Sequence, residues 1–449
     1  MIAAWRASGR PVAVVGLARS GVAASLLLRE RGVPVYASDS APPEQLEGAA
    51  CELSAAGAEV ELGRHDLARI AASQAVVVSP GVPPGAPPLR AAHEAGVPVY
   101  AEVDLGFTEL EGTRVIAVTG TNGKTTTTSL IAHLLRAGGI RAEAAGNIGR
   151  PLSEMVRRGD PPDWLALELS SFQLHDAPHV RPTVGVLTNL APNHLDRYAT
   201  LEEYYADKAR LFANASAASV WVTNADDPAV RSMVCDVPGT HLGFSTRARS
   251  DGWYDREGTV LRLGDAPLLR RDQLPLLGDH NVANALAAAL AVREAGVGHQ
   301  ATAHGLRSFR AIPHRVEPVR EVNGVLWIND SKSTNVTATE VAIAALARPF
   351  VLLLGGRHKD EPYTRLAGLL RNRCRGVVAY GEAQQLVMRD LAGALPVVAA
   401  GSFEDVVARA RELAHPGDAV LLSPACSSYD MFDNYEQRGD RFRAAVEAL

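Results

Sequence analysis

Cysteine is scarce in this chain of 449 residues, which has only four. Cys51, Cys235, Cys374 and Cys426 lie far apart, and no two of them have the spacing of a CxxC motif or of a zinc site. Scattered cysteines are typical of a reducing compartment, where disulfides do not persist. We therefore expect a cytoplasmic protein.

Long apolar runs and an excess of positive charge are also missing. No run reaches the roughly 18 apolar residues of a transmembrane helix, and residues 1–16 lack the apolar stretch of a signal peptide. Lys and Arg number 45 against 50 Asp and Glu, which gives a formal net charge of −5. Proteins that coat nucleic acids carry a basic excess. The composition thus predicts neither membrane insertion nor a nucleic-acid partner.

Short β-branched runs alternate with Ala- and Leu-rich stretches along the whole chain. This rhythm is typical of βαβ units, and it predicts an α/β fold with parallel sheets. The runs expected to be strands are 11–15, 76–79, 114–118, 183–187, 220–223, 349–354, 376–380 and 419–423. We predict three domains, which are a Rossmann-like N-terminal domain over 1–103, a central P-loop ATPase-like parallel-sheet domain over 104–311 and a C-terminal Rossmann-like domain over 312–449.

The sharpest motif is a glycine-rich loop in the second predicted domain. Residues 115–128 read VIAVTGTNGKTTTT and are followed by an apolar helical stretch. A strand, a glycine turn and a helix N-terminus in this order form a phosphate site, in which Lys124 reaches the phosphates and Thr125 ligates Mg²⁺. Position 118 is Val where the strict P-loop spacing has Gly, so the loop is a shortened form. A purely structural glycine turn is the less favoured interpretation.

The first predicted domain also opens with a strand, a loop and a helix, PVAVVGLARSG at 11–21. The next expected strand ends at Asp39, where a carboxylate can bind a ribose hydroxyl, as in dinucleotide-binding folds. Ala18 replaces the glycine that lets the backbone approach a pyrophosphate. NAD therefore fits poorly, and a nucleotide diphosphate held in another way fits better. A Rossmann-like domain with a structural role only is the remaining alternative.

Glu168 and His194 follow strand-like runs of the second predicted domain, and Lys208 lies 14 residues beyond His194 in a helical stretch. A carboxylate at the end of an apolar run such as 164–167 is costly unless it is paired or binds metal. Taken alone, His194 is more often structural and Lys208 more often solvated. Beside a phosphate loop, however, Glu168 and His194 predict a Mg²⁺ site, because Mg²⁺ favours carboxylate and phosphate oxygens.

Motifs spread over the chain then identify a family. They are GTNGKTT (120–126), GNIGRP (146–151), ELSSFQL (168–174), NHLDRY (193–198), LGDHNVANALAA (277–288), IPHRVE (312–317), NDSKSTN (329–335), LLGGRHK (353–359) and SPACSSYDMFDNYEQRG (423–439). In this order they resemble the Mur ligases, which are ATP-dependent amide ligases of peptidoglycan synthesis. The branch that it resembles adds D-glutamate to UDP-N-acetylmuramoyl-L-alanine. The Asn-Pro-Arg signature of the diaminopimelate- and lysine-adding branch is not found, and the folate-polyglutamating relatives lack the front uridine domain.

The resemblance implies a reaction and its participants. An acyl phosphate forms from ATP and the L-alanyl carboxylate, and the amine of D-glutamate then displaces phosphate. The N-terminal domain is expected to bind the uridine nucleotide, the central domain ATP and the C-terminal domain the amino acid. The implied cofactor is Mg²⁺, with two ions of which one is held through a carbamylated Lys208. A monomer without macromolecular partners is expected.

Site residues carry over by position, and they fall into five groups. The catalytic group is Lys124, Glu168, His194, Lys208, His314 and Lys332. The metal ligands are Thr125, Glu168, His194 and Lys208. ATP is expected to contact Gly120, Thr121, Asn122, Gly123, Lys124, Thr125, Thr126, Asn281, Asn284, Arg315 and Asp330. The uridine substrate is expected to contact Arg19, Ser20, Asp39, Ser79, Gly81, Asn147 and Ser170. D-Glutamate is expected to contact Thr334, Lys359, Ser428 and Tyr435.

Some positions depart from the family pattern. Asn193 stands where many relatives have Asp, Tyr435 stands where they often have Phe, and Ala18 and Arg19 vary in the uridine loop. Two other functions compete with the ligase. An NAD-dependent oxidoreductase would use the first domain but leaves the Lys124 loop without a role. A nucleotide-gated binding protein on a degenerate ligase scaffold is disfavoured because Lys124, Glu168, His194 and Lys208 are all retained.

Overall fold

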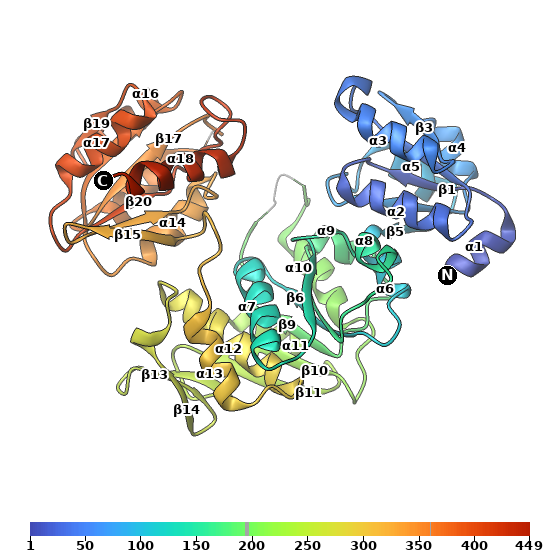
Figure 1. Ribbon diagram of the computed structural model, residues 1–449, viewed down its shortest axis with the longest axis horizontal. Helices are drawn as coiled ribbons and strands as arrows, with labels where there is room; N and C mark the ends of the chain where they lie inside the picture. The colour runs from blue at the N-terminus through green and yellow to red at the C-terminus, as the bar shows by residue number, and fades with distance from the viewer. Residues whose placement is uncertain (194–196, 360) are drawn as a thin grey trace. The chain divides into compact units, whose positions relative to one another are not determined.

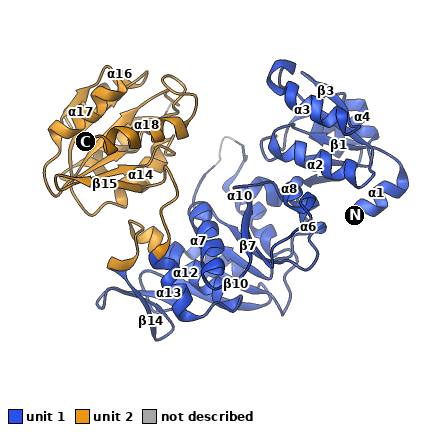
Figure 2. Cartoon of the chain, in the orientation of Figure 1, with its two compact units in different colours: residues 1–271, 283–307 blue, residues 272–282, 308–449 orange. Residues whose placement is uncertain are grey.

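The computed structural model describes residues 1–193, 197–359 and 361–449. Its strands and helices alternate over much of the described chain, with consecutive strands at 240–270 and at 317–329 (Figure 1). The described chain forms two compact units, residues 1–271 with 283–307 and residues 272–282 with 308–449 (Figure 2). The first unit contains two sheets and the second contains one. His194, a predicted catalytic residue and metal ligand, lies outside the described residues.

The N-terminal sheet has five parallel strands in the order β3-β2-β1-β4-β5. The strands are β1 (Val12–Val15), β2 (Val35–Asp39), β3 (Glu59–Leu62), β4 (Ala75–Val78) and β5 (Val99–Ala101). The helices are α1 (Ile2–Ser8), α2 (Arg19–Glu30), α3 (Pro43–Ala55), α4 (Leu67–Ala72) and α5 (Pro87–Glu94). Alternate residues of β1 join two different apolar clusters, so both faces of the sheet are covered, as expected for a parallel sheet.

The central sheet has nine strands in the order β14-β13-β12-β11-β10-β9-β6-β8-β7. The strands are β6 (Arg114–Thr119), β7 (Ala142–Gly146), β8 (Trp164–Glu168), β9 (Val184–Leu187), β10 (Val220–Asn224), β11 (Thr240–Ser245), β12 (Gly252–Asp255), β13 (Val260–Leu263) and β14 (Ala266–Arg270). Pairing is parallel from β7 to β12, and β12, β13 and β14 add an antiparallel edge.

Helices pack on this central sheet and connect it to its neighbours. They are α6 (Glu102–Thr108), α7 (Lys124–Ala137), α8 (Leu152–Arg157), α9 (Ser171–His175), α10 (Leu201–Ala209), α11 (Pro228–Val234), α12 (Asp279–Glu294) and α13 (His299–Ser308). Among the helices of the described residues, none combines the length and apolar character needed to cross a bilayer.

The C-terminal sheet has six strands in the order β15-β16-β20-β17-β18-β19. The strands are β15 (Glu317–Val322), β16 (Val325–Asn329), β17 (Phe350–Gly355), β18 (Cys374–Tyr380), β19 (Val397–Ala399) and β20 (Ala419–Leu422), and only β15 pairs antiparallel. The helices are α14 (Val336–Ala344), α15 (Ala367–Leu370), α16 (Gln384–Asp390), α17 (Phe403–Leu413) and α18 (Tyr435–Glu447). Apolar clusters again cover both faces.

Several predicted site residues lie at the carboxyl ends of parallel strands. β6 ends just before the glycine loop, β8 ends at Glu168, β2 ends at Asp39 and β16 ends at Asn329. Open α/β sheets bind their ligands at this edge. The fold therefore places the glycine loop, Glu168, Asp39 and Asn329 at the ligand-binding edges of their sheets.

Candidate active site

The glycine loop joins β6 to α7 as the sequence predicts. Gly120 has a φ of 142° and Gly123, the N-cap of α7, has a φ of 81°, a region that L side chains rarely adopt. A Cβ at Gly120 would collide with the Thr188 hydroxyl, and one at Gly123 would collide with the Asn284 amide. Glycine is thus required at both positions. The loop ends at a helix N-terminus, where backbone N–H groups and the helix dipole favour a phosphate.

Two predicted catalytic lysines meet at this loop. Lys124 Nζ donates to the carbonyl oxygens of Gly120 at 3.0 Å and Thr121 at 2.9 Å. Lys208 Nζ, on α10, donates to the same Gly120 oxygen at 2.8 Å. Burial, with a further contribution from the nearby Lys124 charge, lowers the pKa of Lys208 to about 6. The fold therefore places a buried amine next to the lysine of the phosphate loop.

Glu168 is buried at the end of β8, with 1% of its surface exposed. Its Oε1 accepts a hydrogen bond from Asn147 Nδ2 at 2.9 Å, whereas Oε2 has no hydrogen-bond partner among the described residues. A buried carboxylate oxygen without a partner is costly unless it binds a cation. Glu168 therefore has the character of a Mg²⁺ ligand.

The described residues contain no cluster of three or more His, Cys, Asp or Glu side chains that could hold a metal ion. A Mg²⁺ site at this loop would instead combine the Glu168 carboxylate and the Thr125 hydroxyl with phosphate oxygens of the nucleotide, which is the donor set that Mg²⁺ prefers. The residues present fit such an ion.

Asn281 and Asn284 lie one turn apart on α12, and both are buried. Asn284 Oδ1 accepts from the hydroxyl of Thr127 on α7 at 3.2 Å, so this asparagine lies against the glycine loop. Asn281 Nδ2 donates to Leu277 O at 2.8 Å. Sequence reasoning missed Asn189, whose side chain fixes the loop by accepting from Asn122 N at 2.9 Å and donating to Asn122 O at 3.0 Å.

A cavity of about 750 Å³ lies at the carboxyl ends of the N-terminal strands. The predicted uridine-site residues that line it are Arg19, Ser20, Asp39, Ser79, Gly81 and Asn147. Ser170 is not among the lining residues; its hydroxyl accepts from Gln173 N at 3.2 Å and caps α9. The size and apolar walls of the cavity suit a nucleotide-sized ligand.

The Asp39 carboxylate forms hydrogen bonds to the backbone of the loops beside this cavity. Its Oδ2 accepts from Leu17 N at 2.6 Å and its Oδ1 accepts from Ala41 N at 2.8 Å. Sequence reasoning missed His65, which follows β3, lines the cavity and lies 2.9 Å from the Ser38 hydroxyl. Burial lowers the pKa of His65. Only its position after a strand could have indicated it.

The second unit gathers the residues predicted to contact D-glutamate. Lys332 Nζ donates to the Tyr435 hydroxyl at 3.0 Å and lies 4.8 Å from the centre of that ring. Lys359 Nζ donates to the Thr334 hydroxyl at 3.4 Å. Burial raises the pKa of Tyr435 to about 12, so its hydroxyl stays protonated. Ser428 is buried after β20, in the same motif as Tyr435.

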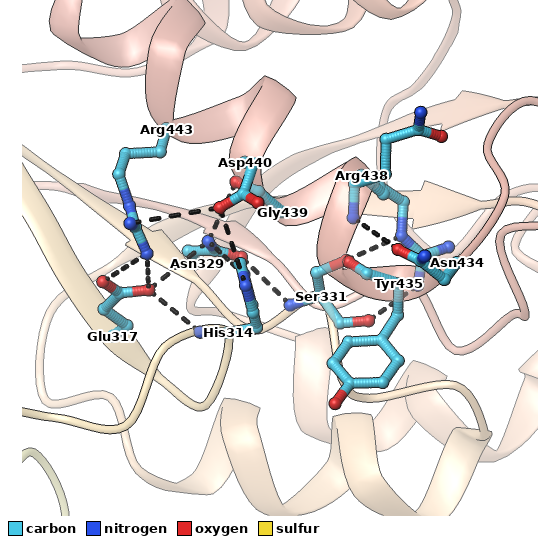
Figure 3. A network of polar contacts seen from close by, with 11 residues as sticks. His314, Glu317, Asn329, Ser331, Asn434, Tyr435, Arg438, Gly439, Asp440 and Arg443 are labelled. Carbon is cyan, nitrogen blue, oxygen red and sulfur yellow. Dashed lines mark hydrogen bonds and ion pairs between the residues drawn. The ribbon is translucent and has the colours of Figure 1, made fainter. Parts of the chain in front are cut away.

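Asp330 and His314 are buried in the second unit, where each forms hydrogen bonds that connect loop segments. Asp330 Oδ1 accepts from Val316 N at 3.1 Å, and its Oδ2 accepts from the Ser423 hydroxyl at 2.8 Å. Burial raises the pKa of Asp330 to about 6. His314 is 6% exposed and lies under α18 (Figure 3). Arg315 follows it in the segment before β15.

Comparisons with known proteins agree along the chain. Three family profiles match, and their descriptions are "Mur ligase MurD-like, N-terminal domain" over residues 10–101, "Mur ligase middle domain" over 118–292 and "Mur ligase, glutamate ligase domain" over 314–426. Proteins named UDP-N-acetylmuramoylalanine--D-glutamate ligase are similar over nearly their whole length. The one from Acidobacterium capsulatum is 42% identical over 446 residues, covering 98% of this chain and 96% of that protein. The one from Myxococcus xanthus is 41% identical and covers 98% and 99%.

Solved structures share the fold at low sequence identity. A pseudomurein peptide ligase type C from Methanothermus fervidus has a TM-score of 0.59 at 20% identity, covering 98% of this chain and 99% of that one. A MurF ligase from Thermotoga maritima in complex with ADP has a TM-score of 0.59 at 18% identity, covering 84% and 90%.

Proposed function

Because the chain belongs to the Mur ligase family, we propose that it is the ligase that adds D-glutamate to UDP-N-acetylmuramoyl-L-alanine in peptidoglycan synthesis. The observation that carries this conclusion is the 42% identity to a ligase of that name over 98% of the chain. The enzyme uses ATP, which it converts to ADP and phosphate.

The reaction has two chemical steps. The L-alanyl carboxylate attacks the γ-phosphorus of ATP, so that an acyl phosphate forms and ADP leaves. The deprotonated amine of D-glutamate then attacks the acyl carbon, and phosphate departs from the tetrahedral intermediate. Two anions must approach in line in the first step, so the site has to offset their repulsion with positive charge.

We assign that charge first to Lys124, which lies in the loop where the phosphates bind. Its hydrogen bonds to Gly120 and Thr121 hold the ammonium over the loop, 2.9–3.0 Å from their carbonyl oxygens. Bound Mg²⁺ supplies further charge and orients the γ-phosphate. Glu168 and Thr125 are the described residues that would hold it, and the unpartnered Oε2 of Glu168 supports this role.

The proposal includes two Mg²⁺ ions and a carbamylated Lys208. The support for the carbamate is that Lys208 is 1% exposed and that burial lowers its pKa to about 6. Its amine is then uncharged near neutral pH, and the uncharged amine is the form that adds CO₂. A carbamate would turn a cation into an oxygen ligand. Because the chain has only four lysines, ¹³C NMR in ¹³C-bicarbonate should show one carbamate signal that Lys208→Met removes.

We assign binding of D-glutamate to the second unit. Lys359 and Lys332 can pair with carboxylates through charge-assisted hydrogen bonds. Thr334 lies in the motif of Lys332, and Ser428 and Tyr435 share the motif at 423–439. We also propose that the enzyme acts as a monomer in the cytoplasm, and that its domains span 1–103, 104–311 and 312–449. The family matches at 10–101, 118–292 and 314–426 fall within these bounds, which supports the division.

The experiment that tests the function measures phosphate release with ATP, Mg²⁺ and UDP-N-acetylmuramoyl-L-alanine against D-glutamate, L-glutamate, L-alanine, L-lysine and meso-diaminopimelate. We expect release with D-glutamate alone. Release with another amino acid would keep the family and overturn the substrate. No release with any of them would favour a nucleotide-gated binding protein.

A further inference from the structure

The backbone that leads into the C-terminal sheet has an unusual conformation at two residues. His314 has a φ of 64° and Val316 a φ of 42°, and a β-branched residue rarely adopts this region. Such conformations persist only where the surroundings determine them strongly, and they cluster at functional sites. The segment carries Arg315, an expected ATP contact, between the two strained residues.

Three hydrogen bonds hold this segment in place. Glu317 Oε2 accepts from His314 N at 2.9 Å, and Asp330 Oδ1 accepts from Val316 N at 3.1 Å. The carbonyl oxygen of His314 accepts from Lys332 N at 3.1 Å. These bonds connect the backbone of His314 and Val316 to Glu317, to Asp330 and to the backbone of Lys332, a lysine expected at the reacting centre.

Asn329, at the end of β16, determines how the His314 ring lies. This asparagine is completely buried. Its Oδ1 accepts from Ser331 N at 3.2 Å, and its Nδ2 faces the Gly439 carbonyl at 3.0 Å and Glu317 Oε2 at 3.4 Å (Figure 3). The Oδ1 side of the Asn329 amide faces a donor, the Ser331 N–H. The Nδ2 side faces acceptors, the Gly439 carbonyl and the Glu317 carboxylate, so the orientation of the amide is fixed.

The fixed amide in turn fixes the proton of the imidazole. His314 Nδ1 lies 3.1 Å from Asn329 Nδ2, which is a donor, so Nδ1 must accept and the ring proton must be on Nε2. Nε2 lies 3.7 Å from Asp440 Oδ1. The ring can occupy this place only because α18 has a glycine there, since a Cβ at Gly439 would collide with Nδ1.

We propose that Asn329 is a positioning residue for the ligase reaction, which holds the His314 ring in its Nε2–H form and through it fixes the segment that presents Arg315 and Lys332. The inference rests on the proposed function. It makes His314 a positioning residue as well, because its ring is buried between Asn329 and α18. An ion pair of Glu317 with Arg443, at 2.8 and 2.9 Å, closes the cluster on its far side.

The first test reads the tautomer directly by ¹⁵N NMR of histidine-labelled protein in mildly alkaline buffer. The chain has 13 histidines, so the His314→Gln variant assigns the signal. We expect the Nε2–H tautomer in the unmodified protein. Asn329→Asp replaces the donor with an acceptor and should move the proton to Nδ1. The matched control is Asn323→Asp, the same change at an exposed turn, which should leave the tautomer alone.

The second test is kinetic. Asn329→Asp should lower kcat by about tenfold or more, because small displacements of reacting groups have effects of this order, while KM for the uridine nucleotide stays nearly unchanged. Gly439→Ala introduces no charge, but its Cβ would displace the His314 ring, so it should lower kcat in the same way. If Asn329→Asp does not fold, the kcat of Gly439→Ala tests the proposal in its place. Gly368→Ala, where a Cβ meets nothing within 4 Å, is its control and should keep the original kcat.

Either of two results would overturn the inference. One is an Nδ1–H tautomer in the unmodified protein, or a tautomer that Asn329→Asp does not change. The other is an unchanged kcat in folded Asn329→Asp and Gly439→Ala. If the unmodified protein releases no phosphate with D-glutamate, the proposed function fails, and the tautomer measurements still decide the arrangement at Asn329.

Discussion

Lys124 and Lys208 donate to one carbonyl oxygen, that of Gly120, although they come from different helices. Burial, with a further contribution from the nearby Lys124 charge, lowers the pKa of Lys208 to about 6. We assign the role of the phosphate-binding cation to Lys124. This division of roles makes a substitution at Lys124 informative.

We expect Lys124→Met to lower kcat by at least about a hundredfold, or roughly 2.7 kcal/mol of transition-state stabilisation. Binding of the uridine nucleotide should persist, because the cavity that we assign to it is lined by other residues. Steady-state kinetics and calorimetric titration check the two parts. Arg136→Met removes an exposed charge from the same helix and should change neither. Loss of uridine-nucleotide binding before loss of turnover would contradict the role given to Lys124.

Residues of the motifs could be predicted from the sequence, whereas residues that act through long-range contacts could not. Lys124 and Glu168 follow strand-like runs, and their residue types and positions alone predict a phosphate-binding lysine and a metal-binding carboxylate. The proposed role of Asn329 depends on its hydrogen bond to the Gly439 carbonyl, 110 residues away in the sequence, and on the pleat of the strand that points its side chain inward. His65 gives no signal beyond its place after a strand.

At the scale of elements, the N-cap of α18 holds the first turn that carries Tyr435. Asn434 Oδ1 accepts from Gln437 N at 2.7 Å. Removing such a cap costs about 1 kcal/mol and frays the first turn. Asn434→Ala should therefore lower the melting temperature and raise KM for D-glutamate. Ser402→Ala removes the equivalent cap of α17, which carries no predicted site residue, and should lower only the melting temperature. If Asn434→Ala and Ser402→Ala changed KM for D-glutamate equally, the change in KM could not be attributed to the cap of α18.

A buried carboxyl on α6 supports the start of α8. Glu102 Oε1 accepts from Ser153 N at 2.6 Å, and burial raises the pKa of Glu102 to about 7. Between the unfolded carboxyl pKa near 4.3 and about 7, the folded chain holds a proton that the unfolded chain releases. Stability therefore falls as pH rises through this window, by up to about 1.4 kcal/mol per pH unit.

Glu102→Gln should remove this pH dependence, because its amide stays neutral and can still accept from Ser153 N. The variant should melt close to the unmodified protein near about pH 5 and above it near about pH 8. Thermal melts across this range check the expectation. Glu94→Gln, an exposed change of the same kind, should show no such divergence. A constant difference between the Glu102 variant and the unmodified protein would contradict a raised pKa.

Some of the strands could be predicted from the sequence, and others could not. Each of the eight runs expected to be a strand coincides with one, from β1 to β20. These strands are covered by helices on both faces, so their sequences are apolar without interruption. The antiparallel edge of β12, β13 and β14 was missed because its short strands are only partly buried and mix apolar with charged residues.

At the scale of the whole molecule, lysine is rare and occurs only at predicted site positions. Lys and Arg together number 45, yet only Lys124, Lys208, Lys332 and Lys359 are lysines. Arginine supplies positive charge elsewhere, and it cannot give up its proton or serve as a compact point charge. All four lysines are predicted site residues. The confinement of lysine to these four positions supports a chemical role for each, which the combined count of Lys and Arg does not show.

This distribution allows a lysine reagent to report on the site alone. With limited acetylation read by mass spectrometry, exposed Lys359 should react first, half-buried Lys124 and Lys332 later and buried Lys208 last. ATP with Mg²⁺ should protect Lys124, and D-glutamate should protect Lys359, because each ligand covers the amine that binds it. The N-terminal amine is the internal control, since neither ligand should alter its rate. Protection of Lys124 by D-glutamate alone, or of Lys359 by ATP alone, would contradict the assignment of the ATP phosphates to the glycine loop and of D-glutamate to Lys359.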